Sequence, residues 1–137
     1  MAVFPTEEWV GALVSLANAS PDFDAAGQGW DGTVCLIVRD PPGAPDGPSR
    51  IRLAGKDGHW FDFGVRPVAG SSDCRLSLSA AYDMWRQLIR QEVGPLRAIL
   101  KGDVAVRGHL PDLLKYRASV VILCELAGRL DTEYSDG

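Results

Sequence analysis

Strand-like segments follow one another through the middle of the chain, and no helical pattern separates them. β-Branched runs, or alternation of apolar and polar residues, mark Trp30–Asp40, Arg50–Ala54, His59–Val65 and Arg75–Leu78. A parallel pair of strands needs a crossover of roughly a dozen residues or more, usually a helix. Because no such helix lies between these segments, the sequence predicts an antiparallel-rich sheet.

Turn signals separate the strand-like segments. The pair Asp57-Gly58 is typical of a tight hairpin, since both residue types tolerate a left-handed backbone. The stretch Pro41–Ser49 contains four prolines and is expected to be a surface loop. A second loop, rich in Gly and Ser, is expected at Ala69–Asp73.

Helical patterns flank the strands. Thr6 predicts the N-cap of a helix whose apolar residues recur to Ala17, and Ser79 predicts the N-cap of a helix over Ala80–Val93. Three further elements follow: a short helix after Gly94-Pro95, a strand at Gly102–Gly108 and a final helix over Pro111–Leu130. The stretch Asp22–Gly29 is expected to be irregular.

This order of segments predicts an α+β fold, with a five-stranded antiparallel-rich sheet and the helices packed on one face. The chain has 137 residues, which is the length of one domain. We place that domain at residues 1–130. Residues 131–137 are expected to form a flexible C-terminal tail.

The charge balance limits the classes of partner. A net charge of −4 without a basic cluster argues against nucleic acid as the main partner and against electrostatic docking on anionic lipid. Met1–Val10 lacks the basic residues of a signal peptide, and the last three residues are not a peroxisomal signal. Val120–Cys124, the longest apolar run of the final helix, is far shorter than the ~20 residues that span a bilayer. A cytoplasmic location is expected.

The three cysteines are Cys35, Cys74 and Cys124. They are odd in number, far apart in sequence and form no CxxC motif, so their spacing fits neither a disulfide framework nor a zinc site. We therefore expect free thiols, as in a reducing compartment.

Signals for catalysis are weak. The only histidines are His59 and His109, and no serine lies in a GxSxG motif. Cys35 falls within a predicted strand and Cys124 within a predicted helix, where buried thiols are ordinary core residues. Neither a metal-binding motif nor a phosphate-binding loop is present, so we expect no catalytic residue, no metal and no cofactor.

The final helix is apolar over more of its circumference than one sheet contact requires. The predicted strand at His59–Val65 adds two phenylalanines to the same layer. Two interpretations remain open: these residues fill a core, or part of the apolar face lines a cavity for an apolar ligand.

The alternating run Leu76-Ser77-Leu78-Ser79 precedes a predicted helix. The segment Ala98–Gly108 (AILKGDVAVRG) then reads as a short helix, a glycine, an alternating strand and a second glycine, and the long apolar helix Pro111–Leu130 follows. In these features the chain from Arg75 to Leu130 resembles the sterol carrier protein type 2 domain, and the order of elements in the N-terminal half agrees.

The resemblance implies a five-stranded sheet covered on one face by helices, with an apolar tunnel between the layers. It also implies non-catalytic binding and transfer of sterols, fatty acids, acyl-CoA or other lipids. We expect the tunnel walls to include Val38, Phe61, Phe63, Trp85, Leu88, Leu100, Val106, Leu113, Val120, Val121 and Cys124.

Three functional hypotheses follow. The first is a lipid carrier, and the second is an auxiliary module that presents an apolar substrate to a partner enzyme. The third is a small enzyme that uses His59 or His109. A transient contact with a membrane or an enzyme, and a homodimer, are all compatible with the sequence.

Overall fold

The computed structural model describes residues 2–39, 48–67 and 74–134. In these ranges the elements are, in chain order, β1 (Ala2–Phe4), α1 (Glu7–Asn18), α2 (Pro21–Ala26), β2 (Asp31–Arg39), β3 (Ser49–Lys56), β4 (His59–Pro67), β5 (Leu76–Ala81), α3 (Tyr82–Ile89), α4 (Pro95–Leu100), β6 (Ala105–Gly108), α5 (Leu110–Lys115), α6 (Arg117–Ala127) and β7 (Thr132–Tyr134).

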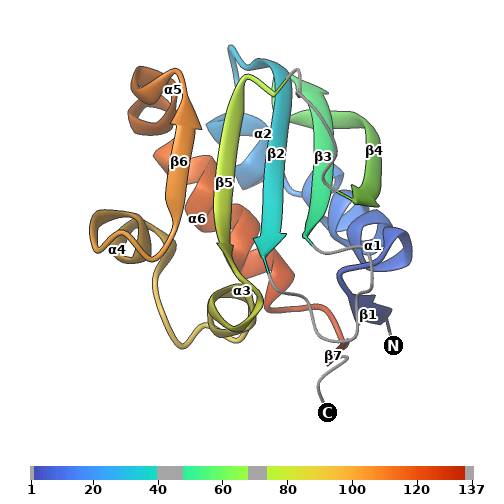
Figure 1. Cartoon of the computed structure of the whole chain (residues 1–137). Coiled ribbons are helices and arrows are strands. Elements are labelled where there is room, and N and C mark those ends of the chain that lie inside the picture. Colours follow the sequence, from blue (N-terminus) through green and yellow to red (C-terminus); the bar gives the residue numbers. More distant parts are fainter. Residues whose placement is uncertain (1, 40–47, 68–73, 135–137) are drawn as a thin grey trace.

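The main sheet has five strands in the order β4-β3-β2-β5-β6. The pairs β2–β3, β3–β4 and β5–β6 are antiparallel, whereas β2 and β5 run parallel. Figure 1 shows α1, α2 and α6 behind this sheet, and α4 and α5 beside its β6 edge. The predicted α+β fold with an antiparallel-rich five-stranded sheet is confirmed.

The first helix forms where its capping signal predicts. The Trp9 backbone N–H donates to Thr6 Oγ1 at 3.3 Å, and Glu7 and Glu8 lie in the first turn, where the helix dipole favours acidic side chains. Trp9, Val10 and Leu13 are buried on the side that faces the sheet.

The segment Asp22–Gly29, expected to be irregular, begins instead with the short helix α2. The Phe23 N–H donates to Ser20 Oγ at 3.1 Å, and Pro21 occupies the first turn, where its missing N–H leaves no helical bond unmade. Six residues are too few to show a helical period. The sequence pattern therefore marks Ser20-Pro21 as the end of α1 and conceals the start of α2.

The second predicted helix begins later than Ser79 and ends earlier than Val93. Ser79 lies inside β5, because the pairing of β5 with β2 continues to Ala81 opposite Arg39. Helix α3 then has Ala81 as N-cap, with no side-chain hydrogen bond at that position. Strand pairing therefore outweighs the local preference of Ser79 for a helix cap.

The predicted final helix is two helices, α5 and α6, separated at Tyr116. The Tyr116 backbone has φ −106° and ψ 22°, outside the helical range. Its buried ring packs edge-on against Trp30 with ring centroids 5.2 Å apart. The break turns this ring towards the sheet, and the packing partner lies too far along the chain for periodicity to reveal it.

The chain ends meet in a small second sheet. Strand β1 pairs in parallel with β7, with Ala2 opposite Thr132, and the Trp9 indole N–H donates to Thr132 Oγ1 at 2.9 Å. The flexible tail predicted from residue 131 is therefore wrong for residues 132–134, whose polar composition concealed a strand. Residues 135–137 lie outside the described part of the chain.

Cys35 and Cys74 form a disulfide, with their Cα atoms 5.7 Å apart. The prediction of three free thiols is therefore wrong, and only Cys124 is free. The parallel pairing of β2 with β5 brings Cys35 near the segment that leads into β5, although the register itself places Ser77 opposite Cys35. Disulfides persist mainly in oxidising compartments. The bond therefore does not support the expected cytoplasmic location, which stays a prediction.

The predicted loops at Pro41–Ser49 and Ala69–Asp73 fall mainly outside the described residues; Ser49 belongs to β3. Among the helices that the structure describes, none is both long and apolar enough to cross a bilayer.

Candidate functional site

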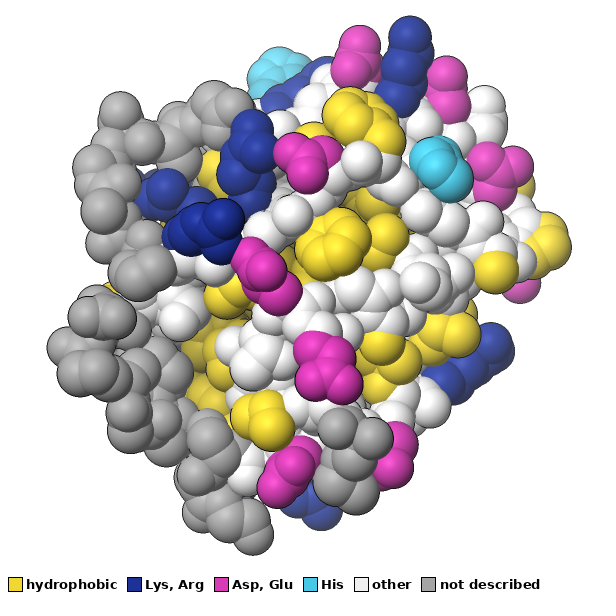
Figure 2. All heavy atoms as spheres, turned by 90° about the vertical axis from the view of Figure 1, so that its right-hand side faces the viewer, with side chains coloured by type: hydrophobic (Ala, Val, Ile, Leu, Met, Phe, Trp, Pro, Cys, Tyr) yellow, Lys and Arg dark blue, Asp and Glu magenta, His cyan; other side chains and the backbone are white. Residues whose placement is uncertain are grey.

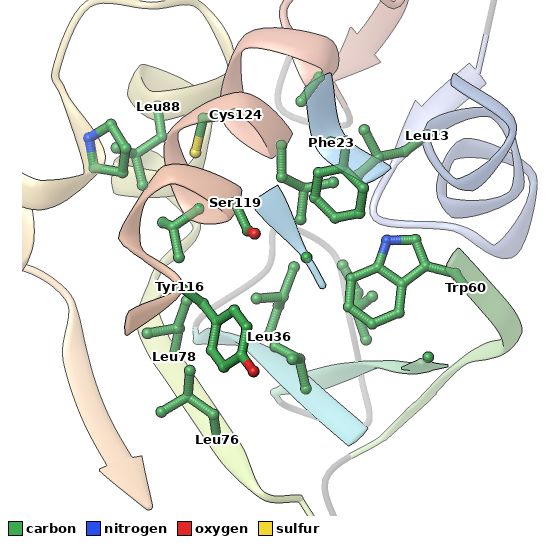
Figure 3. A pocket seen from close by; sticks show the side chains of 18 of the residues that line it. Leu13, Phe23, Leu36, Trp60, Leu76, Leu78, Leu88, Tyr116, Ser119 and Cys124 are labelled. Atoms are coloured by element: carbon green, nitrogen blue, oxygen red, sulfur yellow. The ribbon is translucent and has the colours of Figure 1, made fainter. Parts of the chain in front are cut away.

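An apolar cavity of about 110 Å³ lies between the sheet and the helices that cover it. Figure 3 shows it with side chains from the sheet on one side and from α1, α2 and α6 on the other. It occupies the layer in which the tunnel was expected.

The floor of the cavity comes from the alternating side chains of three adjacent strands. In the register, Val34 lies opposite Leu76, and Leu36 lies opposite both Leu78 and Ile51. Because side chains alternate between faces along a strand, these five residues point to the same side of the sheet. All five line the cavity.

A β-bulge brings Trp60 to this face. Phe63 pairs with Leu53 in normal register, but Trp60 lies opposite Gly55, so that Phe61 has no partner on β3. The extra residue reverses the alternation. The Trp60 ring consequently lies inside, near Phe23 of α2 with ring centroids 5.8 Å apart.

Helix α6 forms the opposite wall. Its cavity residues are Ser119, Val120, Leu123, Cys124 and Ala127, which recur at the spacing of one helix face. Burial raises the pKa of the Cys124 thiol to about 12. At neutral pH this thiol is therefore protonated and a poor nucleophile.

Helix α3 contributes Trp85 and Leu88. The Trp85 indole N–H donates to the Ile37 carbonyl at 2.9 Å, which fixes its ring against the sheet and leaves the rest of the ring for the cavity.

One end of the cavity is closed by Trp30 and Tyr116, and an ion pair supports this end. Arg75 donates to both carboxylate oxygens of Asp112, from Nε at 2.8 Å and from Nη2 at 3.1 Å. Its guanidinium lies 4.9 Å from the centroid of the Trp30 ring. The hydrogen bond from Arg75 to Asp112 raises the pKa of Arg75 above its ordinary value, and Asp112 itself is buried. The pair fastens α5 to the start of β5.

The cavity walls are almost entirely apolar, with two exceptions. Trp60 Nε1 and Ser119 Oγ are buried and have no hydrogen-bond partner in the part of the chain that the structure describes. Lys56 and His59 also border the cavity, but both residues are exposed to solvent.

Four of the eleven residues predicted for the walls do line the cavity: Trp85, Leu88, Val120 and Cys124. The other seven lie elsewhere. Val38 is on the correct face of β2 but is fully buried in the core, and Phe61 is 68% exposed at the bulge. Leu100 is 89% exposed at the end of α4, where its neighbour Ile99 lines the cavity instead.

The remaining four are near the cavity without lining it. Phe63 lies beside Gly11 of α1 on the outer part of the sheet, and Val106 packs against the core from β6. Leu113 of α5 and Val121 of α6 are half-buried. Figure 2 views the edge formed by β4 and α1, where hydrophobic side chains lie between charged ones.

Sequence reasoning missed several wall residues whose signal was available. Leu76 and Leu78 form an alternating pair, and Leu36 lies two residues before Val38 on the same face. Period-two alternation identifies the buried face, but it does not tell which row of that face borders a space. Phe23 and Trp60 depend on α2 and on the bulge, which have no clear sequence signal.

The structure places the two histidines and the possible metal ligands as follows. His59 and His109 are both exposed. Within residues 2–39, 48–67 and 74–134, no group of three His, Cys, Asp or Glu side chains is placed to hold a metal ion.

The chain has the fold of sterol carrier protein 2. It matches a crystal structure of sterol carrier protein 2 with a TM-score of 0.82 and 23% identity, over 91% of this chain and 97% of that one. A conserved hypothetical protein of Thermus thermophilus, for which a sterol carrier role is suggested, matches with a TM-score of 0.81 and 22% identity, over 96% and 92% of the two chains.

A more distant match is a ubiquinone synthesis protein, UbiJ-SCP2, with a TM-score of 0.50 and 16% identity over 85% of this chain and 90% of that one. No family model and no curated protein matches the sequence. The likeness that the sequence showed from Arg75 to Leu130 is thus confirmed for the fold.

Proposed function

We propose that this protein binds an apolar ligand in the cavity and carries it without chemical change. The ligand class is a fatty acid, an acyl-CoA, a sterol or another lipid. The observation that supports this most strongly is the apolar cavity between the sheet and α6, in a fold that sterol carrier protein 2 shares.

The size of the cavity constrains how a ligand is held. Its volume is about 110 Å³, whereas pockets that enclose small molecules run from roughly 300 to 1,000 Å³. A long-chain ligand must therefore displace side chains or extend through an opening. Residues 120–124 of helix α6 are all only half-buried, so this wall is less tightly packed than most of the sheet floor.

The energetics suit a carrier. Burying about twelve methylenes at ~0.8 kcal/mol each contributes roughly 10 kcal/mol. The loss of ligand entropy and the widening of the cavity cost several kcal/mol. The remainder corresponds to an affinity near the micromolar range, which permits both uptake and release.

Two adjacent valines of α6 provide a matched test. Val120 lines the cavity and Val121 does not, although both are half-buried. Val120→Phe should fill the space and weaken uptake of a fluorescent fatty acid at least tenfold, at a stability cost of about 1–3 kcal/mol. Val121→Phe should leave uptake within twofold of the wild type.

Uptake is measured by fluorescence titration, and stability by urea denaturation. Native mass spectrometry of freshly purified protein, followed by lipid extraction, identifies what the cavity holds. Equal effects of the two substitutions on uptake would show that the ligand does not bind in this cavity. A wild type that neither copurifies with lipid nor takes up the fatty acid contradicts the proposed function.

The second candidate is an auxiliary module that presents an apolar substrate to an enzyme. The match to a ubiquinone synthesis protein favours it, because that protein combines this fold with a biosynthetic setting. A stable complex with an enzyme would distinguish this role from free carriage. If the complex depends on ligand in the cavity, Val120→Phe should dissociate it only when ligand is present.

A further inference from the structure

Two hydrogen-bonding atoms, carried by residues that line the apolar cavity, have no partner among the described residues. They are Trp60 Nε1 and Ser119 Oγ, and both are buried. Leaving buried polar groups unpaired is unfavourable and uncommon in folded proteins. In Figure 3 the Trp60 and Ser119 side chains lie on facing sides of the cavity, one from β4 and the other from α6.

The position of Trp60 is held firmly by its backbone. Its N–H donates to Asn18 Oδ1 at 2.8 Å, and Asn18 Nδ2 donates to its carbonyl at 2.9 Å. The ring also rests on Gly55, where an added Cβ would clash with Trp60 Cε3. The end of α1 and the bulge together therefore orient the indole before any ligand arrives.

The other cavity tryptophans show what is unusual about Trp60. Trp30 Nε1 donates to the Gly32 carbonyl at 3.0 Å, and Trp85 Nε1 donates to the Ile37 carbonyl at 2.9 Å. Both of these indoles are satisfied by backbone, and the indole of Trp9, which also lines the cavity, donates to Thr132 Oγ1 at 2.9 Å. Trp60 is the indole bordering the cavity whose donor remains available among the described residues.

Ser119 lies in the first turn of α6. A helical serine commonly donates to the carbonyl four residues earlier, but Ser119 Oγ makes no such bond within the described residues. Its hydroxyl is consequently a second donor on the cavity wall.

The chemistry of the partner follows from these donors. An indole N–H only donates, so the missing partner is an acceptor. Both donors are neutral, and the basic residues that border the cavity, Lys56 and His59, are exposed to solvent. A buried carboxylate would lack a compensating charge. A water molecule needs two to four polar partners, and these two groups supply only the minimum.

We propose that Trp60 Nε1 and Ser119 Oγ form a polar subsite that recognises a neutral acceptor oxygen, a ketone, ester or alcohol, within an otherwise hydrocarbon ligand. This inference rests on the proposed function and narrows its ligand class. A free carboxylate or other charged headgroup stays outside the cavity.

The test compares three ligands of equal carbon number: tridecane, methyl undecyl ketone and tridecanoate. Each competes with a fluorescent hydrocarbon probe, and the measured quantity is the ratio of ketone affinity to alkane affinity. The wild type should prefer the ketone about tenfold. Trp60→Phe and Ser119→Ala should each reduce that preference about threefold to tenfold, whatever their effect on alkane affinity.

Trp85→Phe is the matched control, because its indole also borders the cavity but donates to backbone. It should change both affinities together and preserve the ratio. Circular dichroism checks folding, and the infrared carbonyl band of the bound ketone gives an independent signal in the wild type. Hydrogen bonding should lower its frequency relative to hexane.

Each outcome either supports or overturns the polar subsite. Equal affinity for ketone and alkane, or an unshifted carbonyl band, shows that the ketone oxygen accepts from neither donor and overturns the subsite. Stronger binding of tridecanoate than of the ketone overturns the neutral assignment. Binding of the alkane without preference leaves the carrier function standing, whereas binding of none of the three ligands overturns the carrier function and the subsite together.

Discussion

At the scale of single residues, Cys124 shows how the cavity environment alters chemistry. Its thiol faces the apolar space from α6 (Figure 3), and burial, with a smaller contribution from Glu125, raises its pKa to about 12. The unfolded chain releases this proton near pH ~8.5. Between these values the folded state holds a proton that the unfolded state has lost.

A pH dependence of stability follows, with a definite sign. The contribution of Cys124 is fully present below about pH 8.5 and is lost as pH rises towards 12, by about 1.4 kcal/mol per pH unit. Urea denaturation between about pH 8 and pH 11 should therefore show a shallower decline for Cys124→Ala than for the wild type. Parallel declines in the two proteins would show that the thiol is solvated in the folded state.

Residue types in this sequence predicted the apolar layer but not its geometry. Val38 and Leu36 share one face of β2, yet only Leu36 borders the cavity. Alternation predicts Phe61 and Phe63 on one face, but the bulge at Gly55 gives the inward position to Trp60. Such local shifts depend on contacts with α1 and α2, which are distant in sequence.

At the scale of elements, α2 and the β3–β4 turn form the wall near Trp60 through a close backbone contact. Gly58 has φ +80°, and a Cβ at that position would lie 2.5 Å from the Asp24 carbonyl oxygen. Gly102 has nearly the same backbone, φ +82°, but nothing lies within 4 Å of its Cβ position. Alanine substitutions at these two glycines therefore separate the cost of a left-handed backbone from the cost of a packing clash.

Gly102→Ala should cost about 1–2 kcal/mol, the ordinary penalty of a left-handed residue. Gly58→Ala should exceed that cost by at least ~1 kcal/mol, because α2 must move away from the turn. It should also weaken fatty acid uptake, since α2 carries Phe23 into the cavity. Urea denaturation and fluorescence titration measure both effects. Equal costs at the two positions would mean that α2 is loosely attached.

Helix and strand boundaries followed local signals only where tertiary contacts agreed with them. The Thr6 cap and the Asp57-Gly58 hairpin were predicted correctly, since both are settled by neighbours in sequence. Ser79 stayed in β5, and the final helix broke at Tyr116, because pairing with β2 and packing on Trp30 prevailed.

At the scale of the whole molecule, strand β2 is central to both the sheet and the disulfide. It pairs with β3 on one side and with β5 on the other. The parallel β2–β5 contact was not predicted, because the hairpin of β3 and β4 lies between these strands in sequence. The same contact brings Cys35 beside Cys74 and explains why their spacing did not predict a bond.

The disulfide closes a loop with a sequence separation of 39 residues. Loop-closure entropy then predicts a stabilisation of about 2–4 kcal/mol relative to the reduced protein. Reductant should lower the urea midpoint of the wild type, and it should leave the midpoint of the double variant Cys35→Ala, Cys74→Ala unchanged. The double variant controls for effects of the reductant on Cys124.

Alkylation of the denatured, unreduced chain tests the bond directly. Cys124 is the free cysteine, so mass spectrometry should find one alkyl group per chain before reduction and three after it. Three groups before reduction would show that the bond is absent and would remove the stability difference expected from it. The bond joins β2 to the lead into β5 on the sheet that carries Leu36, Leu76 and Leu78. Its reduction should therefore weaken ligand uptake as well as stability. In Val121→Phe, which leaves the cavity unchanged, reductant should lower uptake and stability as much as it does in the wild type.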